Sequence, residues 1–265
     1  MDEELFLKAA SSGRVEEMKE ILRSNPAVDV NWTQDLSKWS PLLRACHKGH
    51  NSVTELLLAH PDINVNHKHE NGGTPFMMTC YYGSTGCARL LLKDPRVLVN
   101  EPYDDRETPL WWASRGGHLD IIMLWIASGR EMDLGMPEDE RTDAIGMAKK
   151  NGKTEVVALL ERFKSDAAQI RYEVRVELGL LDEAAAEVFA LVVFVSDGLL
   201  QIKDTTTSTP AARYFSIATQ LPLELQMVLC YRVVGSAKEI IPGKDSEVAF
   251  KELAKRLLWS SFFTK

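Results

Sequence analysis

Cysteine is scarce in this sequence, with four among 265 residues, which excludes a disulfide-rich secreted scaffold. A long apolar run is also missing, because the longest begins at Val188 and is interrupted from Ser196 to Gly198, which is too short to cross a bilayer. Positive charge is not in excess either: 31 Lys and Arg stand against 38 Asp and Glu, a net charge of −7. Nucleic-acid affinity comes mainly from cations, so we predict no membrane insertion and no nucleic-acid binding.

Motifs that carry chemistry are absent as well. The sequence contains no G-x-S-x-G nucleophile elbow, no H-E-x-x-H zinc motif and no G-x-G-x-x-G dinucleotide loop. We therefore predict a chain that is not an enzyme and that holds no cofactor and no metal. The acidic start, Met1 to Glu4, lacks the basic residues and apolar run of a secretory signal, so we expect a cytoplasmic or nuclear location.

What the sequence does contain is an internal repeat of 34 residues. A Ser-Pro or Thr-Pro pair opens each copy, and a glycine follows nine residues after the Ser or Thr. The opening residues are Ser40, Thr74 and Thr108, and the glycines are Gly49, Gly83 and Gly117. An extended segment that ends in Asn precedes each copy, at Asn31, Asn66 and Asn100. Less regular copies flank these three, near residues 5–22 and 142–160, as stacked repeats predict for their ends.

Each copy has the residues that build a pair of short helices. Ser or Thr accepts hydrogen bonds from free N–H groups at a helix start, and Pro in the first turn gives up a donor that has no partner there. Glycine permits the sharp turn between the two helices, and Asn stabilises the turn toward the next copy. Because neither short helix can bury its apolar face alone, the copies must stack.

These motifs and their period resemble the ankyrin repeat family, whose copies open with T-P-L-H-x-A, carry G-H between the helices and close with V-N. The resemblance covers a first domain of residues 1–163 and implies an all-α ankyrin-repeat solenoid. The family's His after T-P-L is replaced by Leu43, Met77 and Trp111. We expect apolar packing there in place of the hydrogen bonds that this His makes.

The repeat also explains most candidates for a special site. Cys46 and Cys80 are 34 residues apart at one small-residue position, which indicates core packing. His50 and His118 are the G-H histidines of their copies, and we interpret both as structural. Three further histidines, namely His60, His67 and His69, are predicted to lie in a solvated loop.

Residues 164–265 are predicted to form a second domain, a small helical bundle. Ser165-Asp166 and Asp182 are suitable caps, and Gly179 is a suitable stop. We expect helices over residues 167–178, 183–195, 210–220, 222–235 and 246–259, with a loop at 203–209.

The family resemblance implies that the loop tips and the last turn of each inner helix form a concave face that binds a partner protein. Aromatic residues with a polar handle are favoured as interface anchors, although such rings also pack against a neighbouring loop. The candidate partner-binding residues are Trp39, His47, Lys48, Glu70, Asn71, Tyr81, Tyr82, Asp104, Asp105, Glu107 and Arg115.

Charge is unevenly distributed along this predicted face. The loops of the third and fourth units are acidic, with Glu101, Asp104, Asp105, Glu107, Glu138, Asp139 and Glu140. The first units offer His47, Lys48, Lys68 and His69. Such a gradient orients a partner, and we expect a partner with a basic patch that meets the acidic loops.

One segment of the second half allows an alternative function. Leu221-Pro222-Leu223-Glu224-Leu225 resembles the L-P-x-E-L opening of F-box and F-box-like helices, which in some ankyrin proteins recruit a ubiquitin ligase. The alternative reading is that of an adaptor, but an L-P start is also a common way to begin a helix.

Overall fold

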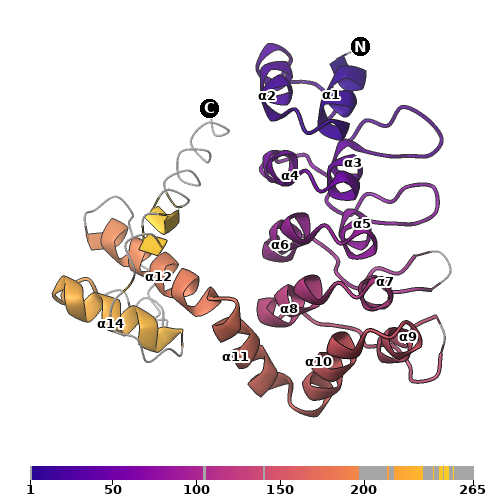
Figure 1. Cartoon of the computed structure of the whole chain (residues 1–265). Coiled ribbons are helices and arrows are strands. Elements are labelled where there is room, and N and C mark those ends of the chain that lie inside the picture. Colours follow the sequence, from indigo (N-terminus) through magenta and orange to yellow (C-terminus); the bar gives the residue numbers. More distant parts are fainter. Residues whose placement is uncertain are drawn as a thin grey trace, which may run out of the picture. The chain divides into compact units, whose positions relative to one another are not determined.

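Helices are the regular elements of the computed structural model (Figure 1), and no strand occurs in the residues that it describes. The described residues are 2–103, 106–139, 141–196, 214, 218–234, 241, 245–246, 248–250 and 253. They fall into two compact units, residues 1–174 and 175–265. The boundary predicted from the sequence, after Phe163, lies one short helix earlier than this division.

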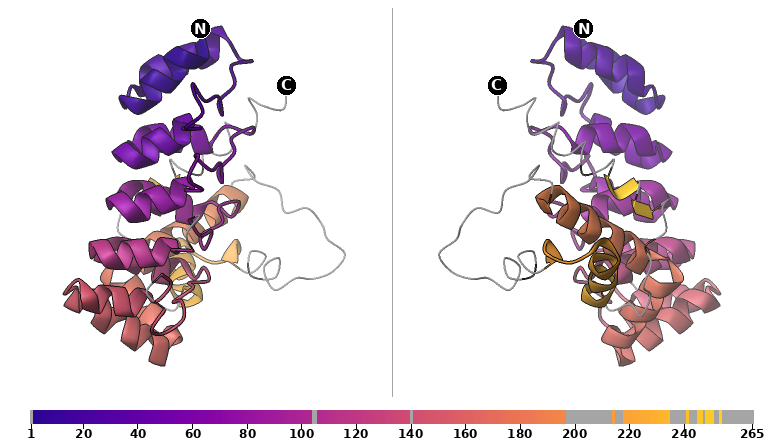
Figure 2. Two further views of the ribbon diagram at one scale, coloured as in Figure 1. Left: turned by 90° about the vertical axis from the view of Figure 1, so that its right-hand side faces the viewer. Right: turned by 90° about the vertical axis from the view of Figure 1, so that its left-hand side faces the viewer.

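In its described residues, the first unit is a stack of helix pairs. The pairs are α1 (Asp2–Ser11) and α2 (Val15–Ser24), α3 (Pro41–Lys48) and α4 (Asn51–Leu58), α5 (Pro75–Tyr82) and α6 (Thr85–Lys93), α7 (Pro109–Gly116) and α8 (Leu119–Ser128), and α9 (Ala144–Lys150) and α10 (Thr154–Ser165). The odd helices form one row and the even helices a second row, with the long loops on the side of the odd row (Figure 1). The turned views show the same stacking (Figure 2). The predicted all-α solenoid is thereby confirmed.

The three full repeats begin and end as their sequence predicts. The cap hydroxyl accepts a hydrogen bond from the backbone N–H three residues on, at 3.4 Å for Ser40 and 3.2 Å for Thr74 and for Thr108. Each of these helices ends at a glycine in the left-handed region, for example Gly83 with φ +74°. This conformation is unfavourable for residues with a Cβ, so the glycine decides where the helix stops.

Two predicted helix starts were wrong. The helix expected from Thr142 begins at Ala144, because the Asp143 carboxylate caps it and accepts from the N–H of Gly146 at 2.8 Å. The helix expected from Glu183 begins at Leu180, so Asp182 lies inside its first turn and is not its cap. In both places the sequence pattern alone did not distinguish the predicted helix start from a neighbouring one.

Apolar packing replaces the family histidine, as predicted. Leu43, Met77 and Trp111 are 0%, 2% and 6% exposed. Cys46 and Cys80 are fully buried in the same helices, and burial raises the pKa of both thiols. The core of the solenoid therefore runs without interruption along the odd helices.

Asparagine side chains connect each repeat to the next one. Asn66 donates from Nδ2 to the carbonyl of Arg96 and accepts from the N–H of Leu98, both at 2.8 Å. Asn31 and Asn100 make the same pair of bonds in their own repeats. Their effect extends beyond the local turn that the sequence indicated, because each bond joins backbone of a neighbouring copy.

The G-H histidines also connect copies, which confirms their structural reading. His50 Nε2 lies 3.1 Å from the carbonyl of Ser11, and His118 Nε2 lies 3.3 Å from the carbonyl of Tyr81. Each imidazole therefore holds the end of the preceding odd helix.

Helix α11 (Ala167–Glu177) follows the solenoid, and its first part packs on it. Ile170 and Val174 are buried, and Arg171 Nε donates to the carbonyl of Ile126 at 3.2 Å. These contacts explain why the first compact unit extends to residue 174.

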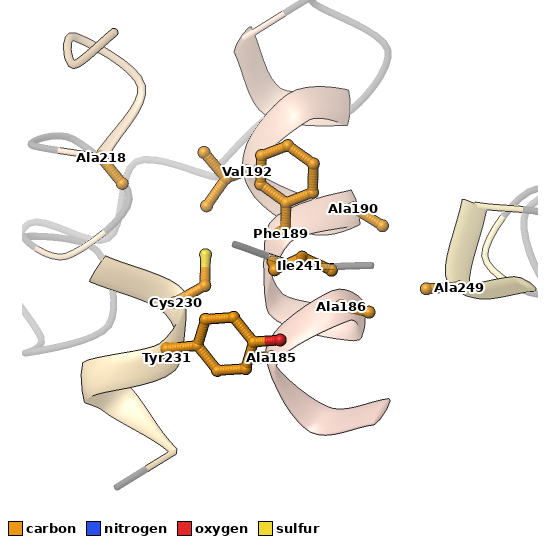
Figure 3. Close-up of a cluster of buried hydrophobic side chains, with 10 residues drawn as sticks. All are labelled: Ala185, Ala186, Phe189, Ala190, Val192, Ala218, Cys230, Tyr231, Ile241 and Ala249. Atoms are coloured by element: carbon orange, nitrogen blue, oxygen red, sulfur yellow. The ribbon is translucent and has the colours of Figure 1, made fainter. Parts of the chain in front are cut away.

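The second unit is built around α12 (Leu180–Ser196) and α14 (Leu223–Val233), which pack against each other. Figure 3 shows their buried cluster, made of Ala185, Ala186, Phe189, Ala190, Val192, Ala218, Cys230, Tyr231, Ile241 and Ala249. The predicted helix from Pro222 is confirmed, while the predicted loop at 203–209 and most of the helices at 210–220 and 246–259 lie outside the described residues. None of the described helices is long and apolar enough to span a membrane.

Candidate functional site

Helices α3, α5 and α7 present equivalent positions on one face of the first unit. His47, Tyr81 and Arg115 are 34 residues apart and lie in the last turn of their helices. Arg44 and Trp112 share a second position one helical turn earlier. Residues three apart lie on the same side of a helix, so these side chains gather on one face.

Aromatic rings on this face touch one another in an unbroken series, here called the aromatic strip. Its members are, in spatial order, Trp39, His47, Tyr82, Tyr81 and Trp112. Successive ring centroids are 5.3, 4.3, 4.6 and 4.5 Å apart, and successive rings are tilted by 49° to 56°. Aromatic pairs at these separations attract each other beyond their burial of apolar area. The strip therefore orders its own side chains across three repeats.

His69 lies beneath the first end of the strip, so its predicted place in a solvated loop was wrong. Its side chain is 6% exposed, and its ring stacks on Trp39 at 5.1 Å and 6°. Gly73 makes room for it, because a Cβ there would come within 2.4 Å of His69 Nε2. His67 is also held, with Nε2 at 2.9 Å from the carbonyl of Lys38. Both histidines thus support Trp39 from the loop.

The middle of the strip stays accessible. Tyr81 is 42% exposed and Tyr82 is 47% exposed, while the other three rings are half-buried. Burial, and to a smaller extent the neighbouring Tyr81, raises the pKa of Tyr82, so its hydroxyl stays protonated and can both donate and accept hydrogen bonds.

Two nitrogens of the strip lack a hydrogen-bond partner within the described residues. They are Nδ1 of His47 and Nε1 of Trp112, and both are buried. A buried polar atom without a partner is unfavourable by about 1–3 kcal/mol. Burial and the adjacent cations Lys48 and Arg44 lower the pKa of His47, which favours its neutral imidazole at pH 7.

Cations flank the strip at both ends. The guanidinium of Arg44 lies 4.7 Å from the ring of Trp39, and that of Arg115 lies 5.0 Å from the ring of Trp112. Both distances suit cation–π attraction. Lys48 is exposed in the last turn of α3. Six of the candidate residues predicted from the sequence therefore lie in or beside the strip: Trp39, His47, Lys48, Tyr81, Tyr82 and Arg115.

The other predicted residues lie in the loops. Glu70 and Asn71 are exposed in the loop before α5, and Glu107 is half-buried just before α7. Three further acidic residues, namely Asp104, Asp105 and Glu140, lie outside the described residues.

Part of the predicted charge gradient is cancelled by pairing. Lys68 Nζ lies 2.7 Å from a carboxylate oxygen of Glu101, although the gradient placed these two residues at opposite ends. Arg106 lies 3.7 Å from Asp139 in the next loop. Some of the carboxylates that were predicted to bind a partner therefore form ion pairs with Lys or Arg side chains of the chain itself.

Sequence reasoning missed two contributors to this face, Arg44 and Trp112, and it placed His69 on the face without predicting that His69 is buried. Arg44 and Trp112 occupy the same repeat position, so aligning the copies at that position as well as at the last helical turn would have found them. No comparable pattern marks His69, whose burial depends on the missing side chain at Gly73.

The comparison with protein families agrees with this architecture. The family described as ankyrin repeats (3 copies) matches residues 6–101 and, in an overlapping match, residues 49–134. Together the two matches extend from the middle of α1 past the end of α8. No curated protein matches the chain. Period, caps, glycine turns and the family match lead to one conclusion: the first half of this chain belongs to the ankyrin repeat family.

Proposed function

We propose that this chain is a non-enzymatic scaffold that binds a partner protein on the face of α3, α5 and α7. Ankyrin repeats are in general protein-interaction modules. The observation that carries the proposal is the aromatic strip, whose central rings, Tyr81 and Tyr82, are nearly half exposed. Tyr and Trp are enriched among the residues that dominate binding energy at protein interfaces.

The strip differs from the other exposed apolar side chains of the described surface. Leu36, Leu98 and Met136 are exposed singly in loops, which is ordinary for a folded protein. The strip is contiguous, and its rings already hold one another in place. A surface ordered before binding loses less side-chain entropy when a partner arrives.

The acidic loops supply a second contact area for such a partner. Glu107 and Glu138 lie in the loops before α7 and α9, next to one end of the strip. A basic patch on the partner protein would meet them there, as the composition of these loops predicts.

A second candidate function rests on the first turn of α14. Leu223 and Leu225 are 53% and 50% exposed, whereas Cys230 and Tyr231 of the same helix are buried and Leu229 packs on the core cluster. The L-P-x-E-L segment therefore presents two leucines on the surface, which supports the adaptor as a second candidate, whereas the packing of Leu229 on the core argues against it.

One capture experiment with the full chain tests both candidates. The variants are Tyr81→Ala with Tyr82→Ala, Leu223→Ser with Leu225→Ser, and the control Tyr172→Ala, which removes an equally exposed tyrosine from α11. Circular dichroism first establishes that each variant is folded. Proteins retained by each immobilised chain are then quantified by mass spectrometry.

We expect the double tyrosine variant to lose specific partners that the wild type and the Tyr172→Ala control retain. An identical set of partners on all of these chains would refute the proposal for the strip. Selective loss of ubiquitin-ligase subunits from the double leucine variant would support the adaptor, and their absence from the wild-type sample would refute it.

A further inference from the structure

Two Asn-Gly pairs occur in the chain, Asn71-Gly72 and Asn151-Gly152. Asparagine is one of the chemically labile residue types. It loses its side-chain amide most readily before glycine, because glycine has no Cβ that keeps the backbone nitrogen away from the side-chain carbonyl carbon. The reaction needs only water, so such an asparagine is a modification site wherever the fold leaves its side chain able to turn.

Both pairs lie in the same kind of turn. The Gly72 N–H donates to the carbonyl of His69 at 2.9 Å, and the Gly152 N–H donates to the carbonyl of Lys149 at 3.1 Å. Both glycines have a positive φ, +83° and +64°, and both asparagines are exposed. Glycine is favoured at this position of a turn. The backbone nitrogen that must react is therefore held to a similar degree in the two turns.

The side chains of the two asparagines differ. Asn151 Nδ2 donates to the carbonyl oxygen of Met147 and also contacts its Sδ atom, both at 2.9 Å, which ties this amide to the last turn of α9. The side chain of Asn71 makes no hydrogen bond in the part of the chain that the structure describes, and only its backbone N–H is held, by Nδ1 of His69 at 3.1 Å. The amide of Asn71 can therefore turn toward the nitrogen of Gly72.

We propose that Asn71 is a site of spontaneous deamidation. The backbone nitrogen of Gly72 attacks Cγ of Asn71, so that a new C–N bond closes a five-membered succinimide. The bond from Cγ to Nδ2 breaks, and the proton of the Gly72 amide leaves with this nitrogen as ammonia. Water then adds to either carbonyl carbon of the succinimide and opens it. One product is aspartate, and the other is isoaspartate, in which the main chain continues through the former side-chain carbon.

The reaction alters a loop that supports the aromatic strip. The succinimide has no N–H at residue 72, so the hydrogen bond to the carbonyl of His69 is lost. Isoaspartate lengthens the backbone inside a turn that the His69 N–H closes on the carbonyl of Gly73 at 3.1 Å. His69 is buried and stacks on Trp39. Isoaspartate at position 71 therefore loosens the support of Trp39. The inference goes beyond the proposed function, since the reaction needs no partner.

Peptide mapping of the aged full chain tests the assignment. The folded chain is incubated in mildly alkaline buffer made with water enriched in heavy oxygen, and a second sample is incubated in the same buffer with guanidinium chloride. Mass spectrometry then measures the fraction of each Asn-Gly peptide that has gained oxygen from the buffer, and chromatography separates aspartate from isoaspartate. The control variant is Asn71→Gln, whose longer side chain does not form the five-membered ring.

We expect Asn71 to react at least about fivefold faster than Asn151 in the folded chain, because the contacts of the Asn151 amide must break first. In guanidinium chloride the two rates should agree within about twofold, since the fold no longer distinguishes them. Asn71→Gln should abolish the signal at residue 71 and leave that of Asn151 unchanged. Equal rates in the folded chain, or an equally large preference for Asn71 in guanidinium chloride, would overturn the inference.

Amide hydrogen exchange measures the effect on the loop, because it reports local opening. Residues 67–73 should exchange faster in the aged chain that contains isoaspartate than in the variant Asn71→Asp, which adds the charge without lengthening the backbone. Exchange as slow as in Asn71→Asp would show that the turn accepts the longer backbone and would overturn the effect on Trp39.

Discussion

At the scale of single residues, the glycine between paired helices carries two separate constraints. Gly83 has φ +74°, and a Cβ there would lie 2.6 Å from the ring of His118. Gly152 has a similar φ of +64° with nothing within 4 Å of a Cβ. The two positions therefore separate the effect of backbone conformation from the effect of a close neighbour.

We expect Gly152→Ala to lower the free energy of unfolding by about 1–2 kcal/mol, the difference for a left-handed residue with a Cβ. Gly83→Ala should lower it further, because His118 must move and lose its contact with the carbonyl of Tyr81. Chemical denaturation of both variants measures the difference. In a chain that already carries His118→Ala, Gly83→Ala should lower the free energy of unfolding only as much as Gly152→Ala does. Equal losses from Gly83→Ala and Gly152→Ala in the otherwise unchanged chain would contradict this explanation.

Residue types at fixed spacing allowed the roles of many single residues to be predicted. Ser40 as a cap, Gly83 as a helix stop and Met77 as a core residue all follow from local chemistry that a single repeat contains. His69 could not be predicted, since its burial requires the empty space above Gly73 and the ring of Trp39. Both become apparent only when the loop is folded.

At the scale of elements, the asparagine bridges fix one repeat to the next. Asn66 makes two hydrogen bonds of 2.8 Å to backbone of the following copy. Hydrogen bonds of this kind contribute about 1 kcal/mol each to stability. We therefore expect Asn66→Ala to lower the free energy of unfolding by about 2 kcal/mol, as measured by denaturation in urea.

Asn71→Ala is the matched control, because this asparagine is exposed in the same segment between α4 and α5 and its side chain makes no hydrogen bond in the described structure. Its substitution should change stability by less than about 0.5 kcal/mol. Equal losses from the two variants would show that the bridge between copies is not what stabilises the stack.

The elements themselves were largely predictable, but their exact starts were not. Period and caps predicted the paired helices, whereas α12 begins at Leu180 and not after Asp182. An apolar sequence supports a helix start at several neighbouring positions, and tertiary packing selects one of them. The strip was likewise predicted only in part. Its members His47, Tyr81 and Tyr82 follow from the last helical turn and Trp39 from the loop before α3, but Trp112 was missed and the continuity of the rings follows from stacking.

At the scale of the whole molecule, stability in a stacked array depends on the interfaces between neighbours. A few residues that cover the end of the array therefore have a large effect on its stability. Helix α11 buries Ile170 and Val174, which are 4% and 3% exposed, and Arg171 donates to the carbonyl of Ile126 in the last turn of α8 and lies over the ring of Phe163 in α10. We propose on this basis that the independently folding unit is residues 1–174 and not residues 1–163.

Two fragments of the chain test this boundary. Residues 1–163 leave exposed the apolar surface that Ile170 and Val174 cover, and burial of two such side chains contributes about 3 kcal/mol or more. Residues 1–174 should therefore unfold at a clearly higher urea concentration, and with a somewhat steeper dependence on urea, because more surface is exposed on unfolding. Circular dichroism of both fragments follows the transition. Ile170→Ser with Val174→Ser in the longer fragment should reproduce the stability of the shorter one, and coincident transitions of the two unsubstituted fragments would place the end of the unit at residue 163 after all.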